Sequence, residues 1–292
     1  MVAHLTAILL LLGEALAVPP ALSGYSITWY DEFDGALGGF PTGGWTRKVV
    51  TDPSSQNSND EVQYYTEYSS DGELWGDGQL FIIPHKKGLG TSASPYYWTS
   101  SRFETTGSWS CPAGKAMIFQ ANLRGPDFTN NPSNLQGIWP AFWAKGNACR
   151  NGGSWPDCGE WDIYETINDL GANNQATLHY KPTNSDHAQF SGKIDYTGAE
   201  YHTWAVKVDR RNSDWTQQKI IWYRDGTDYL TVTGSQIGNL GIWTKIAYSP
   251  FYMILNVAVG GAGSYGGAVT PSTIDGTAAA LRIKWVAVYH ST

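Results

Sequence analysis

The sequence predicts an all-β protein built from two packed antiparallel sheets, a two-sheet β-sandwich or β-jelly-roll. Many short segments rich in β-branched and aromatic residues are separated by turn residues. No stretch keeps the 3.6-residue apolar period of an amphipathic helix. Asp225-Gly226 stands between the apolar runs 220–223 and 229–232, and this pair favours a tight antiparallel hairpin. Hairpin-linked strands in a unit of this size favour two packed sheets over a parallel α/β fold.

The expected strands share a composition rich in β-branched or aromatic residues, and Gly, Pro, Asn or Asp bound most of them. In the first half of the chain they are Ile27–Phe33, Gln79–Pro84, Lys115–Leu123, Gly137–Ala144 and Glu160–Thr166. In the second half they are Gln175–Tyr180, Tyr201–Val208, Lys219–Arg224, Phe251–Val259 and Leu281–Tyr289. Long loops at Thr51–Asn59, Ser92–Ser101 and Gly125–Leu135 are expected to build a cleft on this scaffold.

The N-terminus has the pattern of a signal peptide over residues 1–17. A short apolar run, Leu5–Leu12, is followed by Ala15-Leu16-Ala17 and then by Pro19-Pro20, which predicts cleavage after Ala17 and a secreted, extracellular protein. The run is far shorter than the roughly 20 residues of a membrane-spanning helix. Because no repeat or low-complexity linker follows, we expect a single domain over residues 18–292.

Charge and aromatic content indicate the class of partner. A net charge of −7 without any Lys/Arg cluster argues against nucleic acid and against an anionic membrane, since neutralising phosphates needs clustered cations. The 14 Trp and 17 Tyr residues suit the CH-rich faces of sugars. A neutral or polar partner such as a glycan is therefore favoured, although a large aromatic core would explain some of these rings, and we expect a monomer.

The three cysteines predict one disulfide. Cys149 and Cys158 bracket a Gly/Asn/Pro-rich loop and are the expected pair, which leaves Cys111 as an odd thiol. No cysteine or histidine spacing typical of zinc is present, so no metal site and no required cofactor are expected. The sequence neither predicts nor excludes a structural Ca²⁺ site.

Three acids in six residues form the most informative motif. In a regular strand Glu160 and Asp162 share one face, whereas Glu165 falls on the apolar face with Trp161 and Ile163. Burying an ionised carboxylate there is costly. A one-residue bulge around residues 163–164 returns Glu165 to the face of the other two acids. The motif therefore predicts three carboxylates along one bulged strand.

Such crowding suits glycoside hydrolysis. A retaining glycosidase needs an ionised carboxylate as nucleophile and a protonated carboxyl as general acid, roughly 5 to 5.5 Å apart. An acid between the two would adjust the pKa values of both. The alternative is an edge strand whose acids are simply solvated.

The motif Glu160-x-Asp162-x-x-Glu165 resembles the signature of glycoside hydrolase family sixteen in its bulged, laminarinase-like form. The likeness continues in order over nearly the whole chain after residue 17. Further similar segments are Trp29–Asp34, Asn59–Tyr65, Ser101–Phe103, Gly137–Trp143, Gln175–Tyr180, Tyr201–Trp204 and Leu255–Gly261. The resemblance implies a curved jelly-roll catalytic domain of the concanavalin A-like lectin/glucanase type, and endo-hydrolysis of β-1,3 or mixed β-1,3/1,4 glucan.

The resemblance also implies residue roles. Glu160 would be the nucleophile, Asp162 its assisting partner and Glu165 the acid/base. Trp139 and Trp143 would stack on sugars, and Asn59, Arg102 and His179 would be polar contacts near the cleavage point. For each of these five, the alternative is a residue that fills the core or ties a loop.

The sequence departs from the family pattern where Trp161 and Tyr164 replace the usual aliphatic residues, and Trp161 is expected to face away from the cleft. The loop between Cys149 and Cys158 and the aromatic segment Tyr96-Tyr97-Trp98 are expected to alter the glycone subsites and thereby the choice of substrate. A β-1,3-galactanase, a transglycosylase and a non-catalytic glycan-binding lectin remain alternatives, since fold alone does not fix function.

Overall fold

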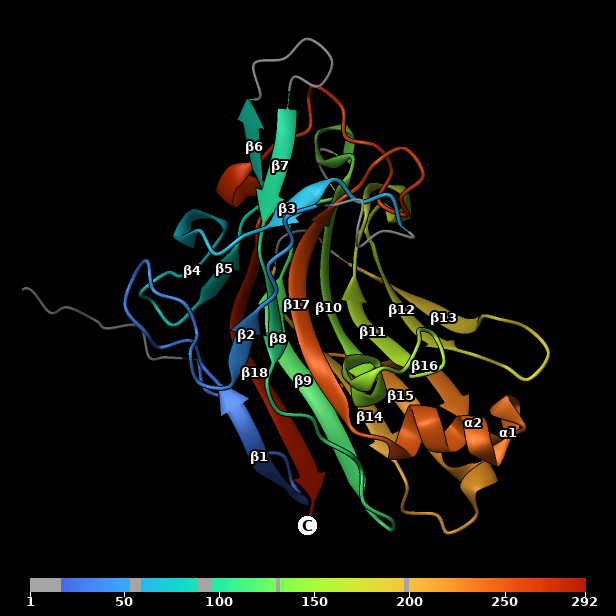
Figure 1. The fold of residues 1–292 in the computed structure, drawn as a ribbon. Coiled ribbons are helices and arrows are strands. Elements are labelled where there is room, and N and C mark those ends of the chain that lie inside the picture. The colour runs from blue at the N-terminus through green and yellow to red at the C-terminus, as the bar shows by residue number, and fades with distance from the viewer. Residues whose placement is uncertain (1–16, 53–58, 89–95, 130–131, 197–199) are drawn as a thin grey trace, which may run out of the picture.

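The computed structural model describes residues 17–52, 59–88, 96–129, 132–196 and 200–292. Within them two large antiparallel sheets pack face to face, as predicted for an all-β sandwich (Figure 1). The expected signal peptide, except for Ala17, lies outside the described residues, as do parts of the three long loops.

The first sheet has the order β16-β15-β14-β9-β18-β5-β4, with β1 also paired to β18. Its strands are β1 (Tyr25–Asp31), β4 (Gly72–Leu74), β5 (Leu80–Ile82), β9 (Ala116–Arg124), β14 (His202–Asp209), β15 (Lys219–Arg224), β16 (Thr227–Thr233) and β18 (Leu281–Ser291). The predicted hairpin joins β15 to β16. Asp225 and Gly226 both have positive φ, 48° and 81°, as a tight two-residue turn requires.

The second sheet has the order β13-β12-β11-β10-β17-β8-β2 and carries the acidic motif. Its strands are β2 (Trp45–Arg47), β8 (Arg102–Thr105), β10 (Ile138–Gly146), β11 (Glu160–Glu165), β12 (Asn173–Tyr180), β13 (Ala188–Asp195) and β17 (Phe251–Val259). One face of this sheet packs on the first sheet. The rings of Phe119 and Trp161 lie 5.8 Å apart across that interface, and those of Tyr164 and Trp204 lie 5.2 Å apart.

The structure differs from the expected fold in its small elements. A third sheet holds β3 (Gln63–Tyr65), β7 (Tyr96–Ser100) and β6 (His85–Gly88), and β3 runs parallel to β7 although antiparallel pairing was expected. After β16 come α1 (Gly234–Ile237), α2 (Leu240–Trp243) and a π-turn, Thr244–Tyr248, none of which the periodicity predicts. The 3₁₀ turns are Ser69–Asp71, Pro132–Leu135, Asn147–Asn151, Asn168–Leu170, Trp215–Gln217 and Gly276–Ala279.

The cysteines pair as predicted. Cys149 is bonded to Cys158, and Cys111 is free. Cys111 is buried, with its Sγ 3.3 Å from the carbonyl oxygen of Lys115, and burial raises the pKa of its thiol to about 11. The disulfide therefore lies beside the acidic strand, whereas the odd thiol lies in the core.

Candidate active site

The predicted bulge is present in β11. Asp162 faces Trp143 of β10, Tyr164 faces Phe142, and Ile163 is the extra residue between these pairs. Glu165 thereby faces Ala141, on the same side of the sheet as Asp162. Trp161 lies on the other side as expected, fully buried and stacked on Phe251 with ring centroids 3.7 Å apart.

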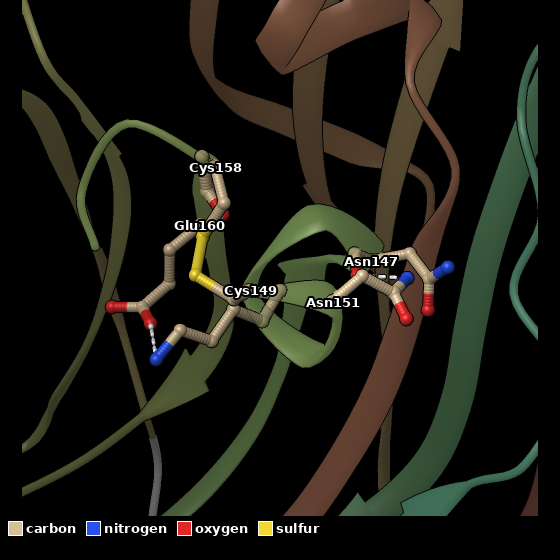
Figure 2. The surroundings of a disulfide bond; sticks show 7 residues. Asn147, Cys149, Asn151, Cys158 and Glu160 are labelled. Carbon is tan, nitrogen blue, oxygen red and sulfur yellow. Dashed lines mark hydrogen bonds and ion pairs between the residues drawn. A yellow bond between two sulfur atoms is a disulfide. The ribbon is translucent and has the colours of Figure 1, made fainter. Parts of the chain in front are cut away.

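The start of β11 is fixed by two glycines and the disulfide. Gly146 at the end of β10 accepts no side chain, because a Cβ would lie 1.8 Å from the carbonyl oxygen of Cys158. Gly159 has φ +78°, a conformation that favours glycine, and its carbonyl accepts a hydrogen bond from Gly146. Figure 2 shows the Cys149–Cys158 bond directly beside Glu160. The loop before the motif is therefore closed onto the sheet at this point.

The three carboxylates line a cleft with a volume of about 300 Å³. All of the predicted site residues line it except His179, which contacts Asp162. Further lining residues, which the sequence did not single out as site residues, are Glu61, Tyr65, Lys145, Trp155 and Asn256.

Nearby positive charge stabilises the ionised form of Glu160. Burial, and after it the charge of Asp162, raise the pKa of Glu160 to about 7. Nζ of Lys145 lies 4.0 Å from a carboxylate oxygen of Glu160. Lys145, His179 and a hydrogen bond from Trp155 all oppose the rise of this pKa. Ionised Glu160 is therefore better stabilised than burial alone would allow.

Asp162 contacts His179, whose imidazole is stacked on that of His187. Burial raises its pKa to about 7, and Lys145 opposes the rise. Nε2 of His179 lies 3.1 Å from Oδ2 of Asp162, as an ion-pair contact and not as an aligned hydrogen bond. Nδ1 of His179 is hydrogen-bonded to Nε2 of His187 at 2.8 Å, and Trp155 packs against both rings. Contacts at both ring nitrogens thus fix the orientation of the His179 imidazole.

Glu165 occupies a different environment. Burial raises the pKa of Glu165 well above its ordinary value of 4.5, and Asp162 raises it further. A hydrogen bond of 2.7 Å from Nε1 of Trp139 to Oε1 of Glu165 opposes this rise. No ammonium or guanidinium group is paired with Glu165 among the described residues. Near neutral pH, Glu165 therefore keeps its proton more readily than Glu160, which is the division of roles that a proton donor and a nucleophile need.

Two of the remaining predicted residues lie together on β8 and β10. The guanidinium of Arg102 lies 4.9 Å from the ring centre of Trp143 and donates to Glu104 at 2.6 Å. Nε1 of Trp143 donates to Oδ1 of Asn256 at 2.7 Å. Asn59 lines the same cleft. Trp139 is 9% exposed, and its indole N–H is directed at Glu165, so it contacts a carboxyl group as well as the cleft.

Lys145, Trp155 and His187 lie at the site but were not predicted from the sequence, and only Lys145 carried a usable signal. Lys145 lies two residues beyond Trp143, so the alternation of β10 places it on the cleft face. Trp155 belongs to the disulfide loop, whose path the sequence does not show. His187 directly precedes β13, and no sequence motif marks it.

A metal ion is one chemical alternative for part of this cluster. Glu160, Asp162 and His179 each offer a ligand atom, and the three atoms lie within 4.8 Å of one another. The ammonium of Lys145 sits 4.0 Å from Glu160, however, and its charge disfavours a cation at that place. The arrangement suits acid–base chemistry better.

Comparison with known proteins identifies the family. Residues 117–219 match the family model described as "XgeA-like, catalytic GH16 domain". The crystal structure of an endo-1,3-beta-glucanase from Streptomyces sioyaensis is 30% identical, with a TM-score of 0.80 over 94% of this chain and 100% of that one. The chain belongs to glycoside hydrolase family 16. The family model runs from β9 to β14 and includes the three carboxylates, whereas Asn59 and Arg102 lie outside it.

Two curated relatives support this assignment to family 16. Glucan endo-1,3-beta-glucosidase A1 of Niallia circulans is 29% identical over 92% of this chain, and the chain spans only 38% of the length of that protein. Beta-glucanase of Rhodothermus marinus is 28% identical over 91% of this chain and 85% of that protein. Similarity to these two glucanases therefore extends over nearly the whole chain. None of the helices in the described part of the chain has both the length and the apolar character needed to span a membrane.

Proposed function

We propose that the chain is a retaining endo-β-glucanase that hydrolyses β-1,3 or mixed β-1,3/1,4 glucan by double displacement. The supporting observation is the bulged strand β11, which directs Glu160, Asp162 and Glu165 into one cleft while their surroundings separate the protonation of Glu160 from that of Glu165. The relatives act on β-1,3-glucan according to their names, which favours the same substrate here.

In the first step Glu165 gives its proton to the leaving glycosidic oxygen and the Glu160 carboxylate attacks the anomeric carbon. The C–O bond to the leaving sugar breaks, and an ester bond to Glu160 forms. Loss of the Glu160 charge makes Glu165, now a carboxylate, the base that takes a proton from water. Water then attacks the same carbon and releases Glu160, so two inversions leave the anomeric configuration retained.

Other residues of the cleft would orient the sugar. Asp162, held by His179, lies between the two reacting carboxyls along β11 and raises the pKa of each. Trp143 and the exposed ring of Trp155 offer apolar faces for sugar stacking. Arg102 and Asn59 line the cleft as polar contacts. The reaction needs no cofactor, because the carboxyls and water supply every proton and bond.

The decisive test is product release from laminarin, lichenan and β-1,3-galactan by the purified wild-type protein and by Glu160→Gln. We expect reducing ends from laminarin or lichenan, the β-anomer appearing first by NMR, and a loss of about 10³-fold or more in the variant because the nucleophile is absent. Glu67→Gln, an exposed position outside the cleft, is the matched control and should retain wild-type activity.

Each alternative predicts a distinct result. Cleavage of β-1,3-galactan alone would indicate a galactanase. Transfer to an acceptor sugar in place of hydrolysis would indicate a transglycosylase. Glycan binding without any cleavage would indicate a lectin and would refute the proposed chemistry, as would an active Glu160→Gln.

A further inference from the structure

The bulge that places Glu165 leaves backbone groups without their usual strand partners. Pairing of β11 with β12 ends at Asp162 and Thr177, and Ile163 has no partner on β10. The carbonyl of Ile163 and the N–H of Glu165 thus need hydrogen bonds from elsewhere, because a buried unpaired backbone group is costly.

One buried side chain satisfies both groups. Asn174 of β12 is fully buried. Its Oδ1 accepts a hydrogen bond of 2.7 Å from the N–H of Glu165, and its Nδ2 donates at 3.3 Å to the carbonyl oxygen of Ile163. An amide is suited to this task because it carries an acceptor and two donors.

The second donor of Asn174 reaches the opposite sheet. Nδ2 lies 3.0 Å from the hydroxyl of Tyr229, which belongs to β16. The Tyr229 hydroxyl itself donates to the carbonyl oxygen of Ile163 at 3.2 Å. Burial raises the pKa of Tyr229, so its hydroxyl stays protonated and able to donate. Asn174, Tyr229 and the bulge therefore share four hydrogen bonds, and each of these bonds joins a donor to an acceptor.

We propose that Asn174 and Tyr229 are positioning residues that hold the β11 bulge and thereby aim Glu165 into the cleft. The inference rests on the proposed function, in which Glu165 is the acid/base. Neither side chain lines the cleft, so both act through the backbone of β11 and not on the sugar.

The test compares two substrates that differ in their need for a proton donor. Cleavage of a laminari-oligosaccharide needs the acid, whereas a dinitrophenyl β-laminaribioside releases a stable phenolate and needs little acid help. The variants are Asn174→Asp, which keeps the acceptor for Glu165 N–H but removes both donors, and Tyr229→Phe, which removes only the hydroxyl. Glu165→Gln serves as the reference for a lost acid, and Tyr223→Phe on neighbouring β15 is the matched control.

We expect kcat/KM on the oligosaccharide to fall by about 10- to 100-fold in Asn174→Asp and by less in Tyr229→Phe, since general acid catalysis contributes 10²- to 10⁴-fold. KM should stay nearly unchanged, and activity on the aryl glycoside should fall only about 2- to 3-fold, well below the contribution of the acid.

Equal losses on both substrates, or undiminished oligosaccharide cleavage in folded variants, would overturn the inference while leaving the proposed function intact. A wild-type protein that cleaves neither substrate would overturn both. Circular dichroism of each variant separates a folding defect from a misplaced carboxyl.

Discussion

At the scale of single residues, the two outer glutamates differ by what surrounds them. Glu160 faces Lys145 and receives a hydrogen bond from Trp155, whereas Glu165 is contacted by the neutral indole of Trp139. The pKa of each carboxyl is raised chiefly by burial, but only that of Glu160 is opposed by a nearby ammonium group. Identical side chains five positions apart can therefore serve as nucleophile and acid.

The raised pKa of Glu165 also predicts how stability depends on pH. Above pH 4.5 the unfolded chain has lost this proton while the folded protein retains it, so the free energy of unfolding falls as pH rises towards the folded-state pKa. Glu165→Gln removes this dependence and keeps the acceptor for Trp139. The variant should therefore gain stability relative to wild type above pH 5, by about 1.4 kcal/mol per pH unit within that window.

Urea unfolding at pH 4.5, 6 and 8 measures this gain. The two proteins should be similarly stable at pH 4.5 and should diverge at pH 8. Parallel pH profiles would show that Glu165 has an ordinary pKa in the folded state.

The acidic residues could be found from the sequence, but their environments could not. The spacing of Glu160, Asp162 and Glu165 gave the motif, its shared face and its bulge. The alternation of side chains along β10 would also have placed Lys145 on the cleft face. The contact of His187 with His179 depends on how the segment from 181 to 187 returns to β13, and no local pattern encodes that path.

At the scale of elements, most long strands were predicted, but the eight-residue β13 was not, and β5 was the one three-residue strand of the described chain that was predicted. All ten expected strands appear within a few residues of their predicted bounds. β2, β3 and β4 have three residues each, too few to show an alternating pattern. The parallel pairing of β3 with β7 joins segments separated by other elements, so it depends on the tertiary fold.

The disulfide loop allows a prediction at this scale. Cys149 and Cys158 are nine positions apart, and closing a loop of this size is expected to contribute roughly 2–3 kcal/mol. The loop carries Trp155 at the cleft and Arg150, which pairs with Glu104. The double variant Cys149→Ser/Cys158→Ser should lose about that much stability and should show a higher KM for laminarin.

Urea unfolding and initial-rate kinetics check both effects. Wild-type protein reduced with dithiothreitol is the control and should reach the stability of the double variant. An unchanged KM in the variant would mean that the loop holds Trp155 without the crosslink.

At the scale of the whole molecule, the sandwich follows from the number of amphipathic strands that must bury one face. Large aromatic side chains, among them Trp161, Trp204 and Trp222, fill the space between the sheets. The short helices after β16 were missed because α1 and α2 have only four residues each, about one turn, so the 3.6-residue apolar period does not repeat within them. The stacking of the two sheets was thus predictable, whereas the connections at their ends were not.

Secretion is also a property of the whole chain, and we propose it from residues 1–17. Expressed in a host with a general secretion pathway, the protein should appear in the medium with Val18 as its first residue. N-terminal sequencing and intact mass measure this, and Ala17→Phe, which blocks the small-residue cleavage site, should retain the leader. Accumulation of uncleaved wild-type protein inside the cell would contradict the proposal.

The buried position of Cys111 has a consequence for oxidative folding. A thiol with a pKa of about 11 has almost no thiolate at neutral pH and cannot reach the bond between Cys149 and Cys158, so thiol–disulfide exchange stops once the sheets close. Mispairing is then confined to the interval before β9 docks on β14 beside Cys111. An odd number of cysteines is therefore tolerable in an oxidising compartment, because the fold itself removes the third thiol from the redox chemistry around it.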